Sequence, residues 1–279
     1  MRGPSEPATC FITGGMSGLG LALARRYLRR GASVAIFDLA LADDTLRTLE
    51  ADRRDAGQTV AAFAVDVTDA RALAEAVADA HAQLGAPTLA IHCAGIQRAR
   101  PFEELAAEHF EQVVNVNLCG SRHFAAAVLP LMAAGSRLAL VSSMAGFAAN
   151  YSYAAYCASK FGVIGLGRVL RLEYKPRGIE VSLICPPEVD TPMVVEEIKH
   201  MHPVSRRLKD LGGTLSLDEA VDAILAGLDA GRGLIIPGGK AKLTYFCSRY
   251  LPDALMNAVV DRIVRAELAA MAKRGDTLS

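Results

Sequence analysis

Residues 8–30 read ATCFITGGMSGLGLALARRYLRR, and this stretch decides the fold. The apolar run ATCFIT has the length and composition of a strand buried on both faces. A glycine-rich turn, TGGMSGLG at residues 13–20, follows it, and a segment rich in Ala, Leu and Arg comes next. The chain therefore begins with a strand, a turn and a helix, which is the opening unit of an α/β domain.

The glycine-rich turn is a candidate phosphate-binding site. Glycines permit a tight turn and let a pyrophosphate approach the amides at a helix N-terminus. The pattern TGxxxGxG departs from the spacing GxGxxG, and a plain strand-to-helix turn is the alternative. The context of strand, turn and helix favours a dinucleotide site. Its candidate contacts are Gly14, Ser17, Gly18, Leu19 and Gly20.

The alternation of apolar runs and helical segments continues along the chain. Further runs lie at residues 33–38, 59–67, 88–95, 137–143, 180–185 and 233–239. Amphipathic helical patterns cover 69–84 and 217–230, beginning at Asp69 and near Ser216. The pattern predicts an α/β fold of Rossmann type, a doubly wound seven-stranded parallel sheet with helices on both faces and right-handed crossovers.

Residues 240–279 differ from the body at residues 1–239. No strand pattern follows residue 239, and apolar residues recur at helical spacing around a break at Pro252. We therefore predict one domain over 1–239 and a helical extension over 240–279. Two roles are compatible with the extension. Its helices could pack on the body or a partner subunit, or they could form a lid or membrane-surface contact that serves an apolar substrate.

Composition excludes several classes of function. Of the 279 residues, 52% are apolar, and the formal net charge is zero. That balance argues against a nucleic-acid partner or a polybasic membrane patch. The six cysteines are scattered without ligand spacing, which predicts reduced thiols and no metal site. His200 and His202 with Glu196 and Glu197 are better explained as a lid helix or an exposed face.

The sequence predicts a cytoplasmic protein without a transmembrane segment. Its first residues, MRGPSEPATCFITGG, contain no apolar core of a secretory signal. The stretch 124–149 carries a single charge, Arg137, but Pro130 and the turn before LALVSS divide it into a helix end and a buried strand.

Asp38 ends the second apolar run, where an acid can accept hydrogen bonds from the adenosine ribose. The same carboxylate would repel a 2′-phosphate. Two unit like charges about 4 Å apart cost on the order of 4 kcal/mol at an effective dielectric constant of 20. No cation compensates, since Leu39 and Ala40 follow the acid. We predict NAD(H) rather than NADP(H); a helix-capping or solvated loop acid is the alternative.

The stretch YCASK at 156–160 carries the chemistry. Tyr156 and Lys160 are four residues apart, so they share one face of a helix. A nearby cation favours phenolate. Moving the pKa of the tyrosine from near 10 to about 7 needs roughly 4 kcal/mol, which a lysine and a charged cofactor together could supply. A solvated helix face is the alternative for such a pair.

Seven ordered motifs resemble the classical short-chain dehydrogenase/reductase family over about residues 8–239. They are TGGMSGLG at 13–20, Asp66–Val67, CAG at 93–95, NVNLCG at 115–120, VSSMAG at 141–146, YCASK at 156–160 and CPPEVDTPM at 185–193. The resemblance implies a nicotinamide cofactor across the ends of the strands and general acid–base catalysis between an alcohol and a ketone.

The resemblance also implies roles for single residues. Ser143 would hydrogen-bond the substrate oxygen, Tyr156 would pass the proton, Lys160 would bind the nicotinamide ribose and lower the pKa of Tyr156, and Asn117 would position water that links the lysine to solvent. The cofactor would be contacted by Asp66, Val67, Cys93, Ala94, Gly95, Pro186, Val189 and Thr191. Cys93 stands where the family usually has Asn, and Pro187 stands where it usually has Gly, which removes a backbone donor.

Within the family, the stretch 141–193, with its double proline and its EYKP helix end, is most similar to 3-ketodihydrosphingosine (3-ketosphinganine) reductases. The resemblance implies a long-chain ketone substrate, although those enzymes use NADPH and Asp38 favours NAD(H). The alternatives are an NAD-dependent dehydrogenase of a small polyol, sugar or cyclic alcohol, and a catalytically silent NAD-sensing module. An apolar pocket, or simple lid packing, would use Met144, Tyr151, Tyr153, Met193, Val194, Val195 and Ile198. The family also implies a homodimer or homotetramer built on helices at 104–134 and 153–176.

Overall fold

A parallel sheet forms the centre of the computed structural model, which describes residues 8–198 and 201–274. Its order is β3-β2-β1-β4-β5-β6-β9, and every neighbouring pair is parallel. The strands are β1 (Thr9–Thr13), β2 (Ser33–Asp38), β3 (Val60–Ala64), β4 (Leu89–His92), β5 (Arg137–Val141), β6 (Glu180–Ile184) and β9 (Leu234–Ile235). The order reverses between β1 and β4, so the fold is the predicted doubly wound sheet, and the crevice at this switch point is where ligands bind in such sheets.

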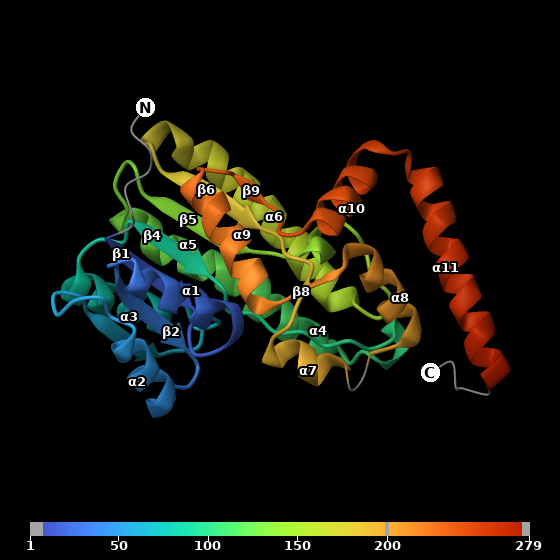
Figure 1. Cartoon of the computed structure of the whole chain (residues 1–279), viewed down its shortest axis with the longest axis horizontal. Coiled ribbons are helices and arrows are strands. Elements are labelled where there is room, and N and C mark those ends of the chain that lie inside the picture. The colour runs from blue at the N-terminus through green and yellow to red at the C-terminus, as the bar shows by residue number, and fades with distance from the viewer. Residues whose placement is uncertain (1–7, 199–200, 275–279) are drawn as a thin grey trace.

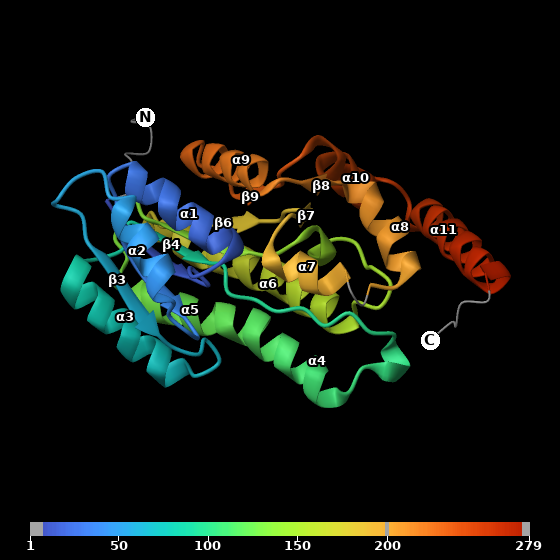
Figure 2. The same cartoon turned by 60° about the horizontal axis from the view of Figure 1, so that its bottom comes forward.

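Helices cover both faces of the sheet (Figures 1 and 2). One face carries α1 (Gly18–Arg29), α2 (Asp43–Ala51) and α9 (Leu217–Asp229), and the other carries α3 (Ala70–Leu84), α5 (Gly120–Val128) and α6 (Ala154–Tyr174). The predicted caps are present, because the side chain of Asp69 accepts from the first amides of α3 and Ser216 forms a capping box with Glu219 at α9.

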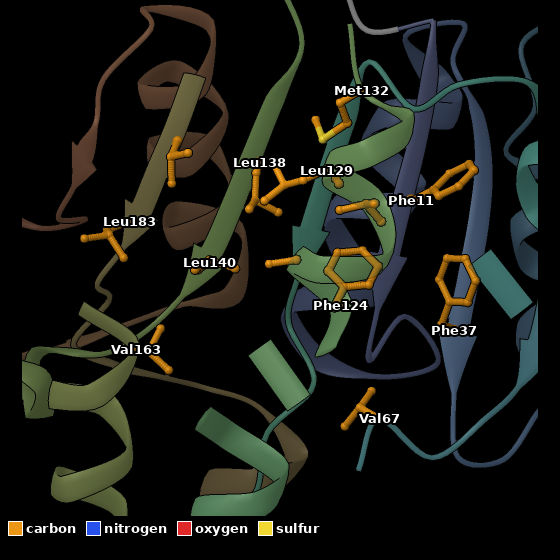
Figure 3. Close-up of a cluster of buried hydrophobic side chains, with 14 of the residues drawn as sticks. Phe11, Phe37, Val67, Phe124, Leu129, Met132, Leu138, Leu140, Val163 and Leu183 are labelled. Carbon is orange, nitrogen blue, oxygen red and sulfur yellow. The ribbon is translucent and has the colours of Figure 1, made fainter. Parts of the chain in front are cut away.

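Alternate strand residues supply the two cores. Phe11 and Phe37 point to the side of α3, α5 and α6, whereas Ile12 and Ile36 point to the side of α1 and α9. Figure 3 shows the first of these clusters, in which Phe11, Phe37 and Phe124 pack near Leu138 and Leu140. Both faces of the central strands are therefore buried, which explains why their sequences are apolar without alternation.

The helix expected over 104–134 is interrupted. A 3₁₀ turn (Phe102–Glu104) precedes α4 (Ala107–Val114), five residues of π-helix (Asn115–Cys119) separate α4 from α5, and a second 3₁₀ turn (Leu129–Leu131) ends the segment. A π-turn inserts one extra residue per turn and re-aims the side chains within it, and such turns occur frequently at functional sites. Here it turns the buried Asn117 toward the residues that follow β4.

A smaller layer lies beyond the end of β6. The chain forms β7 (Glu188–Val189), α7 (Pro192–Ile198), α8 (Pro203–Gly212) and β8 (Thr214–Leu215), and β7 pairs with β8 in a separate two-stranded sheet. Two further 3₁₀ turns lie at Met144–Gly146 and Lys175–Arg177.

The C-terminal extension is helical, as the apolar spacing predicts. It consists of α10 (Gly239–Tyr250) and α11 (Asp253–Arg274), and the break falls at Pro252. Both helices pack against α8, and α11 stands at the side of the molecule away from the sheet (Figure 1). None of the helices within the described residues is long and apolar enough to cross a membrane.

Candidate active site

One cavity of about 550 Å³ collects the residues that the sequence singles out. It opens at the carboxyl ends of the central strands. Its lining includes every predicted cofactor contact: Gly14, Ser17, Gly18, Leu19, Gly20, Asp38, Asp66, Val67, Cys93, Ala94, Gly95, Tyr156, Lys160, Pro186, Val189 and Thr191. Ser143 also lines it, whereas Asn117 is buried behind the wall, 1% exposed.

The glycine-rich turn forms a close-packed floor. Gly14 has φ +65° and Gly18 has φ +50°, a region that residues with a side chain rarely adopt. A Cβ on Gly20 would lie 2.1 Å from the carbonyl oxygen of Gly14, so only glycine lets α1 approach the turn. Ser17 caps α1 without a side-chain hydrogen bond, which leaves the first amides of the helix for a ligand. These residues fit a dinucleotide pyrophosphate.

Asp38 lies at the end of β2 beside this turn. Its Oδ2 accepts a hydrogen bond from the amide of Met16 at 2.9 Å, and its Oδ1 accepts from the amide of Leu39 at 2.8 Å. The two bonds fix the carboxylate at the rim of the cavity. Among the described residues that line the cavity, the lysines and arginines are Lys160 and Lys209.

The Thr13 hydroxyl joins β1 to the segment after β4, next to Cys93, the position at which the resemblance predicts an asparagine. The Thr13 hydroxyl accepts from the amides of Cys93 and Ala94, each at 3.2 Å, and it pairs with Nδ1 of His92 at 2.8 Å. Backbone positions after β4 are therefore tied to β1 without an amide side chain. Only one ring nitrogen of His92 is paired, since its buried Nε2 has no partner among the described residues. Burial lowers the pKa of His92 to about 3, which keeps the ring neutral.

Ser143, Tyr156 and Lys160 meet in the cavity. Ser143 follows β5, its hydroxyl accepts from the amide of Ala145 at 3.1 Å, and it lies near enough to the phenol of Tyr156 to lower the pKa of that group. Lys160 lies one turn further along α6, with Nζ 5.5 Å from the centre of the Tyr156 ring. Its ammonium donates to the carbonyl of Val141 at 3.0 Å. Helix α6 and the end of β5 thus place a hydroxyl, a phenol and an amine together.

The expected lowering of the tyrosine pKa by the lysine is not found in the protein alone. Burial raises the pKa of Tyr156 well above its ordinary value, and the nearby Ser143 hydroxyl opposes this only in part. Burial also lowers the pKa of Lys160 to about 8. The phenolate of Tyr156 and the ammonium of Lys160 both lose hydration in this buried site, and the ammonium already donates to the carbonyl of Val141. Proximity on the helix therefore does not by itself favour the phenolate.

Asn117 ties three segments together. Its Oδ1 accepts from the amide of Ile96 at 2.8 Å, and its Nδ2 donates to the carbonyl of Ile96 at 3.0 Å and to the hydroxyl of Ser159 at 2.9 Å. Both amide hydrogens are engaged by protein atoms. The side chain therefore holds the segment after β4 against the helix that carries Tyr156 and Lys160.

The double proline shapes the wall opposite the glycine-rich turn. The carbonyl of Pro186 accepts from the amide of Met144 at 2.9 Å, which joins the end of β6 to the segment of Ser143. Thr191 reaches over the turn, since a Cβ on Gly18 would lie 3.6 Å from its methyl group. Pro187 and Val189 line the cavity between these points.

The predicted substrate-lining set is only partly correct. Met144, Tyr153, Met193 and Val194 line the cavity, but Val195 and Ile198 are 64% and 56% exposed and point elsewhere, and Tyr151 is not part of the lining. Glu197, which the sequence suggests to be an exposed or lid residue, is buried and lines the cavity. Within the described residues no cluster of three metal-ligating side chains exists; His200 lies outside them.

Sequence reasoning missed several groups at the site. Thr13 belongs to the turn motif, but the sequence indicates only that it ends a strand. Its hydrogen bonds to the segment after β4 can be recognised only once β1 and β4 are known to be neighbours. The pairing of Glu197 with Lys209 joins residues of two helices that follow the sixth strand. Thr244 of α10 lines the cavity as well, and no sequence signal connects the extension to the site.

Comparisons with known proteins agree on the family. The family model described as short chain dehydrogenase matches residues 8–202. The chain is 36% identical over 230 residues to 3-dehydrosphinganine reductase TSC10B of Arabidopsis thaliana, covering 80% of this chain and 67% of that protein. It is 31% identical over 258 residues to 3-dehydrosphinganine reductase of Danio rerio, covering 89% and 73%.

A solved structure shares the fold. A short chain dehydrogenase from Mycobacterium paratuberculosis, bound to NAD, superposes with a TM-score of 0.74 at 23% identity, covering 84% of this chain and 97% of that one. The chain spans about two thirds to three quarters of the length of the two curated relatives.

Proposed function

The chain belongs to the short-chain dehydrogenase family, and from that premise we propose that it transfers hydride between NAD(H) and a long-chain, 3-ketosphinganine-like alcohol or ketone. Its membership makes it an oxidoreductase that acts on a small molecule through a nicotinamide cofactor. The observation that carries the proposal is that an open helix N-terminus and the group of Ser143, Tyr156 and Lys160 share one cavity.

The catalytic roles follow from what each side chain can do. The cofactor supplies or accepts the hydride. Tyr156 donates the proton to the carbonyl oxygen in reduction, and its buried, protonated phenol is suited to that direction. Ser143, whose hydroxyl lies near the phenol, orients the same oxygen. Lys160 holds the cofactor ribose, and Asn117 acts as a positioning residue for the segment at Ile96.

Asp38 supports the preference for NAD(H). Its carboxylate is fixed at the rim by two backbone amides, and neither Ser17 nor Leu39 offers a positive charge to a 2′-phosphate. Lys160 and Lys209, the cations of the lining within the part of the chain that the structure describes, belong to its catalytic and substrate walls. Binding of NADPH would therefore cost desolvation and repulsion without a compensating ion pair.

An apolar substrate is supported by the far wall of the cavity. Met144, Met193, Val194 and Leu208 are among the lining residues, and the flexible side chains of the two methionines can adapt to an alkyl chain. The relatives named for 3-dehydrosphinganine reduction point to the same class. The substrate is assigned to this chain as a proposal, since the aligned part omits about a third of the plant relative.

A ketone series of increasing chain length tests the substrate. With NADH oxidation as the readout, kcat/KM should rise with length by up to about threefold to fourfold for each buried methylene, from about 0.8 kcal/mol of transfer free energy. A flat series, or a preference for small polyols over every long ketone, would refute the proposal. It would favour the small-alcohol alternative instead.

The division into a body at 1–239 and an extension at 240–279 is also a proposal.

We propose in addition that the extension meets a membrane surface. On it, Leu243, Phe246, Tyr250, Leu251, Leu255 and Val259 are at least 36% exposed. Thr244 of the same helices lines the cavity, so a surface that meets a membrane would lie next to the substrate site. Cosedimentation with neutral lipid vesicles tests this, and equal recovery in the supernatant with and without vesicles would contradict it.

We further propose a homodimer or homotetramer built on α6. Phe161, Val169 and Leu172 on this helix are 47%, 51% and 71% exposed. Exposed apolar side chains gathered on one helix are typical of a surface that packs against another subunit. Sedimentation analysis of the protein and of Leu172→Asp should show a loss of the larger species in the variant. A wild-type protein that sediments as a monomer would contradict the assignment, and the cytoplasmic location stays a prediction.

A further inference from the structure

A chain of buried charges forms the cavity wall at α7 and α8. The phenol of Tyr153 and the ammonium of Lys209 both donate to Oε1 of Glu197. Lys209 also donates to Oε2 of Glu188 at 2.9 Å. The side chains of Glu188 and Glu197 each keep 4% of their surface exposed, and both residues line the cavity. Carboxylates this deeply buried require partners.

The wall has one carboxylate oxygen that is free to accept a hydrogen bond. Lys209 has two carboxylates as partners, and its Nζ lies 5.3 Å above the ring of Tyr153. Glu188 accepts from Arg206 and Thr214 as well as from Lys209, so both of its oxygens are engaged. Oε2 of Glu197 accepts no hydrogen bond from the residues that the structure describes. A ligand meeting this wall would therefore find a carboxylate oxygen.

Glu197 shares its cation. Its only cationic partner among the described residues is Lys209, which also pairs with Glu188. Arg206 pairs with Glu188 and with Asp210, whose side chain is 55% exposed, and forms no ion pair with Glu197. A further positive charge would give Glu197 a counter-charge of its own. In a buried site a missing counter-charge costs more than at the surface, which favours capture of a cation over that of a neutral hydroxyl.

The free oxygen lies close to the reacting group. The rings of Tyr153 and Tyr156 meet edge to face with their centres 6.3 Å apart, and Tyr153 bonds directly to Glu197. The charge of Glu197 is near enough to contribute to the raised pKa of Tyr156. A group bound by Glu197 would therefore sit beside the carbonyl that Tyr156 protonates.

We propose that Glu197 binds the protonated amine of a 2-amino ketone and thereby selects amino ketones over plain long-chain ketones. This inference rests on the proposed function and adds a specificity residue to it. Tyr153 and Lys209 hold the carboxylate in place, and the ammonium of the substrate takes the open oxygen. Charge-assisted hydrogen bonds of this kind are the stronger ones in proteins.

The test compares two substrates of equal chain length, a 1-hydroxy-2-amino-3-ketone and its deaminated 1-hydroxy-3-ketone, at about pH 7, where an α-amino group is mostly protonated. In wild-type protein kcat/KM should favour the amine by about tenfold or more. Glu197→Gln should remove most of that preference. Glu188→Gln is the matched control, because it neutralises a carboxylate of the same network that has no open oxygen, and the preference should stay within about twofold of wild type.

The outcomes separate the two levels of the argument. A Glu197→Gln variant that loses activity equally on both ketones would show a structural role and overturn the inference. Wild-type protein that reduces both ketones equally well would also overturn it while the proposed function stands, and this measurement needs no variant to fold. Wild-type protein that reduces neither long-chain ketone would refute the proposed function itself.

Discussion

Replacement of Asp38 by Asn tests the electrostatic basis of cofactor choice. The carboxylate lies at the end of β2 and is held by the amides of Met16 and Leu39 at 2.9 and 2.8 Å. A 2′-phosphate bound at the ribose position would place a second negative charge about 4 Å away, which costs on the order of 4 kcal/mol at an effective dielectric constant of 20. Because Asp38 is only half-buried, solvent screening reduces this to roughly 2 kcal/mol, or about thirtyfold in Kd.

The assay is titration of NADH and NADPH followed by nicotinamide fluorescence. Wild-type protein should bind NADH at least about thirtyfold more tightly, and Asp38→Asn should bring the two constants to within about fivefold, mostly through tighter NADPH. Asp66→Asn is the control, since Asp66 carries the same charge and lines the same cavity, with Oδ1 bound to the amide of Thr68 at 2.8 Å. It should shift both constants alike. Wild-type protein that binds NADPH more tightly, or an unchanged ratio in Asp38→Asn, would refute the reasoning.

Three further outcomes are expected. Tyr156→Phe should lower kcat by about a hundredfold or more while the Kd for NADH stays within about threefold, and a kcat near wild type would remove Tyr156 from proton transfer. For Lys160, whose pKa is lowered to about 8 by burial, the unfolded chain binds more protons than the folded one above that pH, so stability should rise with pH. In urea unfolding, the free energy of unfolding of wild type relative to that of Lys160→Met should therefore rise by about 2 kcal/mol between pH 7.5 and 9.5. A difference between the two proteins that does not change with pH would contradict this. Gly20→Ala should abolish dinucleotide binding or folding because its Cβ would lie 2.1 Å from the Gly14 carbonyl, whereas Gly165→Ala, with open space around its Cβ and a helical position, should be neutral or stabilising by up to about 1 kcal/mol. Equal melting temperatures and NADH affinities in the two variants would show that the turn tolerates a side chain.

The local pattern of apolar residues was sufficient to predict the alternating strands and helices of the sheet. Strands buried on both faces must be apolar throughout, and the helices between them must carry one apolar stripe, so the alternation is visible in single residues. The same reasoning located the turn at 13–20 and the pair Tyr156 and Lys160, because their spacing in the chain fixes their spacing on a helix. It failed within 104–134, since a π-turn depends on what Asn117 can reach across the fold.

The sequence by itself determined which residues the protein brings to its cavity: the glycines of the first turn, the acid after β2, and the serine, tyrosine and lysine near α6. Only the tertiary structure decided how those groups behave there. The pKa of Tyr156 rises because burial disfavours the phenolate and Ser143 opposes this only in part, the Thr13 hydroxyl accepts hydrogen bonds beside Cys93, and Glu197 meets Lys209 across two helices. The physical reason is that composition and periodicity report burial of one element at a time. Desolvation and charge pairing depend on distances between elements that are far apart in the chain.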